Sequence, residues 1–394
     1  MSPATIEKPA PELPELSRQR LEAAGIDLTK AYPEHPKKVL YLQDVYKLRG
    51  EDREYIDPAS RADPEKKALF SAAKEVKDVT VHIGTEIIGL QLKDLTDQQR
   101  DELALLIAER GVVFFRDQDL SPQKQLELGA YFGEVEVNPQ DAYVPGLPGT
   151  TVVWFVCKAP RPSRPLAAMS NTQSFRSRPA FTATMPMFDY YFRNPFGTQR
   201  WHTDMAYEHQ PPGYTHLHND AVPEVGGDTL WASGYAAYDK LSPAFREMIE
   251  GRECVYRSAY KFLDREDAAG GPKLVERTHP MVRVHPVTGW KSLYVNRAMT
   301  LRIVGLDQGE SDAILNYLFS VYEGNVDIQC RFRWTPGTSA IWDNRVTMHS
   351  AAWDYEGKGK RHGTRVSSLA EKPFYDAKAT SRRRALGLAG PKEY

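Results

Sequence analysis

The sequence predicts a mainly β fold: an antiparallel barrel or sandwich with helices on its outside. Segments with strand-like composition dominate after residue 200, and helical segments occur among them without a regular βαβ alternation. The 27 glycines and 28 prolines indicate many turns. With 394 residues, of which 41% are hydrophobic, the chain is long enough for one large domain with an extension or for two domains.

Composition argues against several classes of partner and location. The 51 basic and 52 acidic side chains leave a net charge of -1, which gives no overall attraction to nucleic acid or to an anionic membrane. No apolar run reaches the roughly 18 residues of a membrane span, and the charged, proline-containing N-terminus is unlike a signal peptide. The few cysteines are far apart, so neither a disulfide framework nor a zinc knuckle is expected. We therefore predict a cytoplasmic protein that binds neither nucleic acid nor membranes.

Residues 1–76 are predicted to form an N-terminal extension. Their first part is rich in proline, and the segment 49–67 is dense in charge, a composition typical of disordered or surface segments. The short apolar segment 39–42 is suited to dock on a larger body, and no catalytic grouping occurs in the extension. We expect the extension to be partly disordered or to wrap as an arm around the main domain, 77–394.

The main domain is expected to begin with strands and a helix. Residues 79–92 have the pattern of strands that are interrupted by two glycines. Thr96 then begins a helix, because Gln99 completes a capping box, and Gly111 ends that helix.

The remaining elements follow from similar signals. Two helices begin at a serine–proline pair, a third shows apolar residues one turn apart, and the strands are short apolar or β-branched runs. The expected helices are 121–133, 242–249 and 310–322, and the expected strands are 112–115, 214–218, 282–285, 292–295, 331–334 and 340–342.

The triplet His202-Thr203-Asp204 carries most of the chemical information in this chain. Residues two apart in an extended strand face the same way, so His202 and Asp204 can reach one metal ion. The triplet alone is a weak signal, and the third ligand must come from a distant part of the chain, for which His349 is the candidate. Two imidazoles and one carboxylate form a facial set that leaves metal positions open, as in a non-haem Fe(II) oxygenase. Arg361, downstream of His349, suits a cosubstrate that carries carboxylates.

Five short motifs surround these residues. They are Trp201-His-Thr-Asp204, Pro211-Pro-Gly213, Gly226-Gly-Asp-Thr229, Trp342-Asp-Asn-Arg345 with His349, and Arg361-His-Gly-Thr-Arg365. In this order they resemble the motifs of the taurine dioxygenase family of Fe(II)/2-oxoglutarate-dependent oxygenases, over roughly residues 79–375. The resemblance implies a double-stranded β-helix (jelly roll) flanked by helices, and the N-terminal extension is similar to that of the longer fungal members.

The resemblance also implies the cofactors and the residues that hold them. His202, Asp204 and His349 match the catalytic iron ligands, and Thr229 and Arg361 match the residues that bind the distal carboxylate of 2-oxoglutarate. The implied cofactors are Fe(II), the cosubstrate 2-oxoglutarate and O2. The implied reaction is that of an oxidoreductase that oxidises an unactivated C–H bond and releases succinate and CO2. The presence of Asp204 argues against a halogenase, in which that carboxylate is missing.

The substrate implied by the resemblance is a small anion. Arg365 matches the arginine that meets the anionic end of the substrate, and Met299 stands where taurine-cleaving members have a phenylalanine. Because Arg361 and Arg365 are four apart on a strand, they share one face about 13 Å apart. The segment 137–143 lacks the histidine of taurine-cleaving members, and residues of about 158–200 form a lid-like insertion. We therefore expect an alkyl sulfonate, a sulfate ester or an amino or other carboxylic acid rather than taurine.

Alternatives remain open at this point. The same cofactors can drive oxidative cyclisation or desaturation of an amino acid in secondary metabolism. A second hypothesis is an oxygenase of proteins or nucleic acids on the same scaffold, and the neutral charge balance argues against nucleic acid. A third is a non-catalytic binding module, and the complete ligand set argues against it. His216 and His218 share a strand face and form a rival metal pair. Family members often pair, so a homodimer or higher homo-oligomer is a further expectation.

Overall fold

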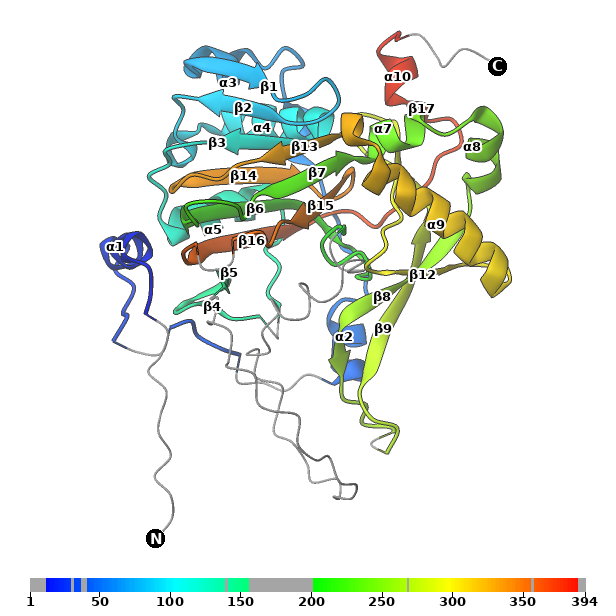
Figure 1. Ribbon diagram of the computed structural model, residues 1–394, viewed down its shortest axis with the longest axis horizontal. Coiled ribbons are helices and arrows are strands. Elements are labelled where there is room, and N and C mark those ends of the chain that lie inside the picture. Colours follow the sequence, from blue (N-terminus) through cyan, green and yellow to red (C-terminus); the bar gives the residue numbers. More distant parts are fainter. Residues whose placement is uncertain are drawn as a thin grey trace.

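A large, mostly antiparallel sheet forms one wall of the fold (Figure 1). The computed structural model describes residues 12–29, 32–36, 41–138, 141–155, 201–267, 269–355 and 358–388. The insertion expected at 158–200 and the beginning of the N-terminal extension lie outside these ranges. Within them the sheet has the strand order β1-β2-β3-β14-β6-β16-β5-β4, in which β2 and β3 are parallel and the other neighbours antiparallel. The strands are β1 Glu75–Asp78, β2 Thr85–Ile88, β3 Val112–Phe115, β4 Tyr143–Val144, β5 Leu147–Phe155, β6 Pro212–Ala221, β14 Thr338–Asp343 and β16 Arg361–Leu369.

A smaller sheet lies face to face with the large one. It has the order β13-β7-β15, with β7 at Thr229–Ser233, β13 at Gln329–Phe332 and β15 at Thr347–Ala351. Phe114 of β3 stacks on Phe332 of β13 with 3.8 Å between ring centroids, and Trp231 of β7 meets Phe114 edge-on at 5.2 Å. These rings fill the space between the sheets and confirm the predicted sandwich, whose two facing sheets form a double-stranded β-helix.

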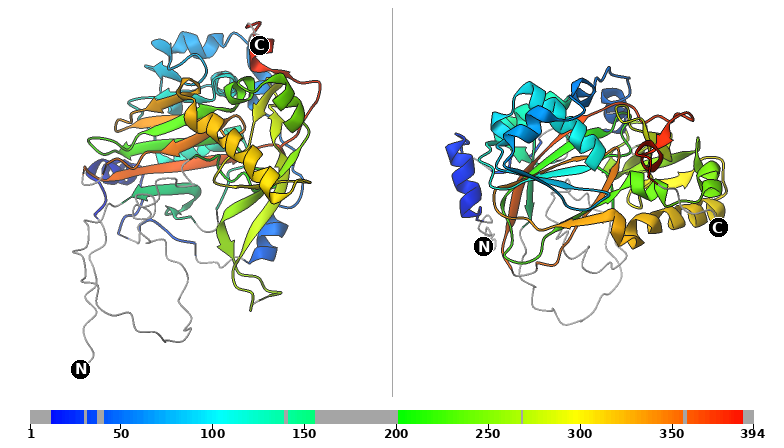
Figure 2. Two further views of the ribbon diagram at one scale, coloured as in Figure 1. Left: turned by 45° about the vertical axis from the view of Figure 1, so that its right-hand side comes forward. Right: turned by 90° about the horizontal axis from the view of Figure 1, so that it is seen from above.

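Two helices cover the outer face of the large sheet (Figure 2, right, cyan). They are α4 (Asp97–Arg110) and α5 (Pro122–Phe132). Thr96 and Gln99 form the predicted capping box of α4, and Gly111 ends it with a φ of +77°. Because side chains alternate along β3, Val113 and Phe115 pack toward the helices, whereas Val112 and Phe114 face the interior.

A second group of elements packs beside the barrel and encloses the largest hydrophobic cluster. It contains a sheet of order β12-β8-β9, a second sheet of order β10-β11-β17, and the long helix α9. The elements are β8 Glu253–Phe262, β9 Lys273–Pro280, β10 Val282–Val284, β11 Trp290–Leu293, β12 Thr300–Ile303, β17 Thr380–Ser381, α7 Gly234–Asp239, α8 Pro243–Ile249, α9 Gln308–Gly324 and α10 Arg382–Ala385.

The N-terminal residues pack against both parts. Helix α1 (Glu15–Ala23) lies on β6, where Ser17 donates a hydrogen bond to Asp220 (2.6 Å). Helix α2 (Leu42–Leu48) lies beside β8 and β9, and the Leu42 amide donates to the carbonyl of Leu263 (2.8 Å). The 3-10 helix η1 (Pro58–Arg61) and α3 (Lys67–Ala72) pack on α4. The division into an extension and an oxygenase domain stays a prediction.

Some predicted strands differ from those observed, and the one expected at 292–295, for example, lies at Trp290–Leu293. The first strand lies at Glu75–Asp78 instead of just before Gly84, because the Thr80 hydroxyl exchanges hydrogen bonds with the backbone of Ile83 and closes a turn. The strand expected at 331–334 ends at Phe332, and Trp334 turns its indole N–H inward, onto Thr229 (3.0 Å).

Candidate metal centre

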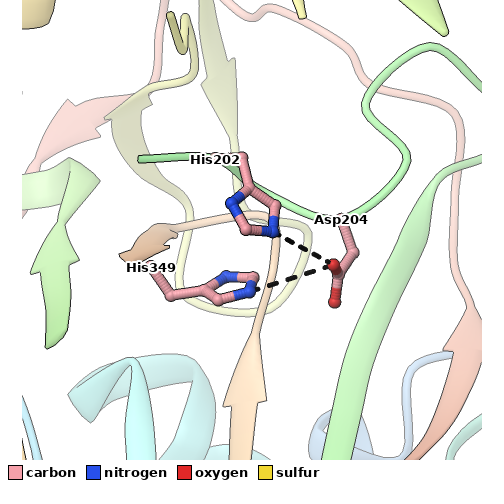
Figure 3. A group of neighbouring side chains, drawn as sticks. All are labelled: His202, Asp204 and His349. Atoms are coloured by element: carbon pink, nitrogen blue, oxygen red, sulfur yellow. Dashed lines mark ion pairs between the residues drawn. The ribbon is translucent and has the colours of Figure 1, made fainter. Parts of the chain in front are cut away.

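Side chains from two distant parts of the chain converge: His202 and Asp204 from one segment and His349 from another (Figure 3). Oδ1 of Asp204 lies 3.7 Å from Nε2 of His202 and 3.9 Å from Nε2 of His349. All three candidate ligand atoms lie within 4.8 Å of one another. Ligand atoms about 2.1 Å from a metal ion are about 3 to 4 Å apart, so this arrangement suits a single ion after a small contraction.

Backbone pairing brings the two histidines together. The His202 amide donates to the His349 carbonyl (3.0 Å), and the His349 amide donates to the His202 carbonyl (2.7 Å). The segment that contains His202 thus runs antiparallel to the middle of β15, and the centroids of the two rings lie 4.1 Å apart. Directly after Asp204, Met205 has a φ of +46°, a left-handed conformation that turns the chain back toward β6.

A network of buried polar groups fixes the carboxylate of Asp204. The hydroxyl of Thr215 donates to Oδ2 of Asp204 (3.2 Å) and accepts from the Asn344 amide group (2.8 Å). Oδ1 of Asn344 accepts hydrogen bonds from the Asp204 amide (3.3 Å) and from the indole of Trp342 (3.0 Å). Such outer partners orient a metal ligand and set its basicity.

The protonation states suit a cation between these groups. Burial and the neighbouring His202 lower the pKa of His349 to about 3, so its imidazole is neutral near pH 7. Burial acts to raise the pKa of Asp204, but Arg365 and the two imidazoles outweigh burial and hold that pKa below its ordinary value. A neutral imidazole and an ionised carboxylate are the forms that bind a metal.

Arg365 of β16 approaches the three candidate metal ligands, called the metal group below, from one side. Its Nη1 lies 3.5 Å from Oδ1 of Asp204, and its Nη2 lies 3.3 Å from Oδ2 of Asp141. The phenol of Tyr260 donates to the other oxygen of Asp141 (2.9 Å). Burial acts to lower the pKa of Arg365, but the two carboxylates outweigh burial and raise it. The guanidinium is therefore a fixed positive charge next to the metal group.

Arg361, on the same strand, is a buried cation of a different kind. Its side chain is 3% exposed, its Nη2 lies 3.5 Å from Oγ1 of Thr229, and its Nε has no hydrogen-bond partner. Among the residues that the structure describes, no carboxylate lies within ion-pair distance of it, and Asp228 is bonded to Arg331 instead. Burial lowers the pKa of Arg361. A buried guanidinium with a free edge fits the carboxylate of a cosubstrate such as 2-oxoglutarate.

Sequence reasoning missed several residues of this site. Asp141 and Tyr260 hold Arg365, and Trp334 holds Thr229. Asn344 was visible in the motif 342–345, but only the fold shows which side chains it contacts. No local signal marks the other three, because each contacts a partner that lies far away in the sequence.

Three further residues singled out in the sequence, Met299, His216 and His218, are buried. Met299 is 9% exposed and belongs to the hydrophobic cluster that also contains Met205. His216 and His218, the rival metal pair, are buried on β6 and both lie 3.0 Å from the hydroxyl of Ser339. Ser339 is thus a hydrogen-bond partner of both imidazoles, whereas Nδ1 of His216 is buried without one among the described residues.

The fold and the three candidate ligands define a class of protein. A facial set of two histidines and one carboxylate within a double-stranded β-helix is the arrangement of a non-haem Fe(II) oxygenase. The family model described as "Taurine catabolism dioxygenase TauD, TfdA family" matches residues 75–367. The chain belongs to this family, which confirms the resemblance seen in its motifs.

Individual relatives agree with the family. The alpha-ketoglutarate-dependent sulfonate dioxygenase of Saccharomyces cerevisiae is 36% identical over 367 residues, which cover 90% of this chain and 82% of the relative. The alpha-ketoglutarate-dependent dioxygenase cnsP of Penicillium expansum is 36% identical over 329 residues, 82% of each chain. A crystal structure of a taurine dioxygenase from Burkholderia xenovorans has a TM-score of 0.60 at 28% identity and covers 76% of this chain and 91% of that one.

The predicted enzyme class, fold class and cofactors are thereby confirmed. The protein is an Fe(II)/2-oxoglutarate-dependent dioxygenase with a jelly-roll fold, and it uses Fe(II), 2-oxoglutarate and O2 to act on a small molecule. In the described ranges, every helix is too short or too polar to cross a lipid bilayer.

Proposed function

We propose that His202, Asp204 and His349 bind the Fe(II), and that the enzyme oxidises an unactivated C–H bond of a small anionic substrate. The substrate is an alkyl sulfonate, a sulfate ester or an amino or other carboxylic acid, and the other products are succinate and CO2. The observation that carries this proposal is the position of two arginines of β16, one beside Asp204 and one buried next to Thr229.

Arg361 and Thr229 are assigned to the cosubstrate. The free edge of the Arg361 guanidinium binds the distal carboxylate of 2-oxoglutarate, and the Thr229 hydroxyl adds a hydrogen bond. Trp334 keeps that hydroxyl in place through its indole N–H, and the centroid of its ring lies 5.8 Å from the guanidinium carbon of Arg361. Fe(II), 2-oxoglutarate and dioxygen together supply the oxidising power that breaks the C–H bond of the substrate. The protein's part is to exclude water and to fix the orientation of both acids.

Arg365 is assigned to the anionic end of the substrate. It is 22% exposed in its side chain, so a substrate can reach it, and its contact with Asp204 puts the bound anion close to the metal. Asp141 already shares this guanidinium, which lowers the net positive charge that a substrate meets. Met299, which belongs to the same hydrophobic cluster as Met205, is also assigned to the substrate. The S. cerevisiae relative is named for sulfonates.

A second outcome of the same chemistry is oxidative cyclisation or desaturation of an amino acid. The ligand set is the same for both outcomes, and they differ in the product. Hydroxylation adds one oxygen atom to the substrate, whereas cyclisation and desaturation each remove two hydrogen atoms. Mass spectrometry of the products therefore separates them. The cytoplasmic location, the homo-oligomer and the lack of contact with nucleic acid and membranes stay predictions.

The decisive experiment is a turnover assay. The enzyme is loaded with Fe(II) without oxygen, mixed with 2-oxoglutarate and one acid from a panel of sulfonates, sulfate esters and amino acids, and then exposed to O2. We expect at least one acid to raise succinate formation well above the level without substrate and to yield an oxidised product. If no acid in the panel does so although iron is bound, the proposed substrate class is wrong.

A further inference from the structure

The guanidinium that is assigned to the substrate anion already holds a carboxylate of its own chain. Nη2 of Arg365 lies 3.3 Å from Oδ2 of Asp141, and the two side chains are 22% and 16% exposed. A substrate anion that reaches Arg365 therefore finds Asp141 on one edge of the guanidinium. The other carboxylate near Arg365 belongs to Asp204, which is assigned to the metal.

Strand pairing brings Asp141 to the level of Arg365. Arg365 of β16 pairs with Thr151 of β5, and Thr151 pairs in turn with Tyr143 of β4. Asp141 lies two residues before Tyr143, in a bend outside the regular strands. The other oxygen of its carboxylate accepts a hydrogen bond from the phenol of Tyr260, on β8 (2.9 Å). The carboxylate is thus held between two separate strands, with one oxygen toward each.

The contact between Arg365 and Asp141 is looser than a structural ion pair of the same fold. Nη2 of Arg345 lies 2.7 Å from Oδ2 of Asp343, and both side chains are fully buried. The 3.3 Å between Arg365 and Asp141 is longer than the roughly 2.7–2.9 Å of a strong charge-assisted bond, and solvent reaches both side chains. Because partly exposed ion pairs contribute little to stability, Asp141 can leave Arg365 at small cost.

Asp141 keeps a hydrogen-bond donor when it leaves Arg365. Its two contacts use different oxygens, Oδ1 for Tyr260 and Oδ2 for Arg365, so the first contact does not depend on the second. The charge of Asp141 and burial raise the pKa of the Tyr260 phenol, which therefore remains a donor at neutral pH. The carboxylate can thus be displaced without being left unpaired, and it stays close enough to return when the site empties.

We propose that Asp141 is an internal competitor for the anion site: its carboxylate occupies Arg365 in the substrate-free enzyme, and the anionic end of the substrate displaces it. The inference rests on the proposed binding of an anion by Arg365. An inorganic anion gains little beyond the guanidinium, so at low concentration it leaves the site to Asp141. An organic acid also buries apolar surface when it binds, and this additional free energy displaces the carboxylate. Asp141 therefore sets how tightly an anion must bind to occupy the site.

Anion binding to the full-length protein tests this competition without turnover. Calorimetric titrations use the protein loaded with Mn(II) and saturated with 2-oxoglutarate, and the two probes are inorganic sulfate and propanesulfonate. Asp141→Asn keeps the shape of the side chain but removes its charge. Because a like charge next to the bound anion is lost, we expect this variant to bind both probes at least about tenfold more tightly than the wild type. A simple competitor weakens every anion equally, so the factor should be the same for both probes.

Three further variants assign the effect to the contact with Arg365. Asp141→Ala removes the same charge with a smaller side chain and should act in the same direction. Glu134→Gln is the matched control for the change of net charge, because Glu134 is 59% exposed and paired with Arg53, and its affinities should stay within about twofold of the wild type. Arg365→Met should lose the binding of both probes. Thermal unfolding establishes that each variant is folded.

The results that overturn the inference differ from those that overturn the proposed function. If Arg365→Met loses both probes but the Asp141 variants bind them no more tightly than the wild type, the anion site stands and the competitor falls. Weaker binding by Asp141→Asn would also overturn the competitor, because Asp141 would then position Arg365 for the anion. If Arg365→Met binds both probes as the wild type does, or if no variant binds either probe, the assigned anion site falls and the competitor falls with it.

Discussion

Two buried arginines of this fold have opposite surroundings. Arg345 is fully buried and is bonded by Asp343 at Nε (2.8 Å) and Nη2 (2.7 Å) and by Asp57 at Nη1 (2.5 Å). Arg361 is 3% exposed, and among the residues that the structure describes it contacts no carboxylate; its neighbours include the hydroxyl of Thr229 at 3.5 Å and the ring of Trp334. Burial alone lowers the pKa of both, but the carboxylates around Arg345 outweigh burial and raise its pKa.

The difference distinguishes Arg345, whose charge has a structural role, from Arg361, whose charge is proposed to bind a ligand. A buried cation costs several kcal/mol unless carboxylates and hydrogen bonds compensate it. At Arg345 the protein provides the compensation itself and links the N-terminal arm, through Asp57, to the barrel. At Arg361 the described residues provide no such compensation, which fits the proposed binding of the dicarboxylate 2-oxoglutarate at this position.

The largest expected effect is on stability at the compensated site. Arg345→Met leaves Asp343 and Asp57 buried without their cation, and should lower the free energy of unfolding by about 3–5 kcal/mol. Urea denaturation of the metal-free protein measures this loss. Arg331→Met is the control, because its side chain is 53% exposed and its ion pairs should contribute less than about 1 kcal/mol. Equal effects of the two substitutions would contradict the comparison.

The matching substitution at the uncompensated site should act on the cosubstrate. Arg361→Met removes a charged hydrogen-bond donor that contributes about 1.5–3 kcal/mol, so the KM for 2-oxoglutarate should rise about 10- to 150-fold. Stability should stay the same or increase, because an uncompensated buried charge is lost. Arg361→Lys keeps the charge and should recover part of the affinity. A large loss of stability with an unchanged KM would show that Arg361 is structural as well.

Buried histidines should make the stability of the protein depend on pH. Burial lowers the pKa of His216 to about 3, so the folded protein keeps this imidazole neutral while the unfolded chain takes up a proton below pH 6.5. Stability is therefore complete above pH 6.5 and falls as the pH drops toward 3, by about 1.4 kcal/mol per pH unit for each such histidine. Urea midpoints at pH 7, 6 and 5 measure this slope. His216→Gln should reduce it by one proton, and an unchanged slope would show that other groups cause it.

The smallest expected effect concerns the neutral partner of Arg361. Thr229→Val removes a hydroxyl that contributes about 0.5–1.5 kcal/mol, so the KM for 2-oxoglutarate should rise about two- to tenfold with little change in kcat. Thr229→Ser should restore the wild-type KM in steady-state assays. A larger fall in kcat than rise in KM would assign Thr229 to the reaction step instead.

The metal group and the main architecture could be predicted from the sequence. His202 and Asp204 lie in one local motif, and His349 closes a second one, so their convergence follows once the two motifs are placed on neighbouring strands. The helix that begins at Thr96 was predictable because its capping box is local. The lack of a carboxylate partner for Arg361 could not be predicted, because it depends on the ion pair that Asp228 forms with Arg331 of another strand.

The partners of Arg365 and of Arg49 could not be predicted. Asp141 reaches Arg365 across 224 residues of sequence, and Arg49 reaches Glu208 from the N-terminal arm. Such contacts depend on how the loops and α2 pack on the barrel, which neither periodicity nor capping signals report. The sequence placed no catalytic grouping in the extension, and the structure nevertheless puts Arg49 in the wall of a cavity near the metal group.

The most direct test of the central claim is a comparison of Fe(II) binding and 2-oxoglutarate-dependent O2 consumption in the wild type, Asp204→Ala and Asp141→Asn. We predict one Fe(II) per chain in the wild type and in Asp141→Asn, because Asp141 contacts Arg365 but is not a ligand. Asp204→Ala should lose both the bound iron and the O2 consumption. An Asp204→Ala protein that remains folded and consumes O2 at the wild-type rate would contradict the account.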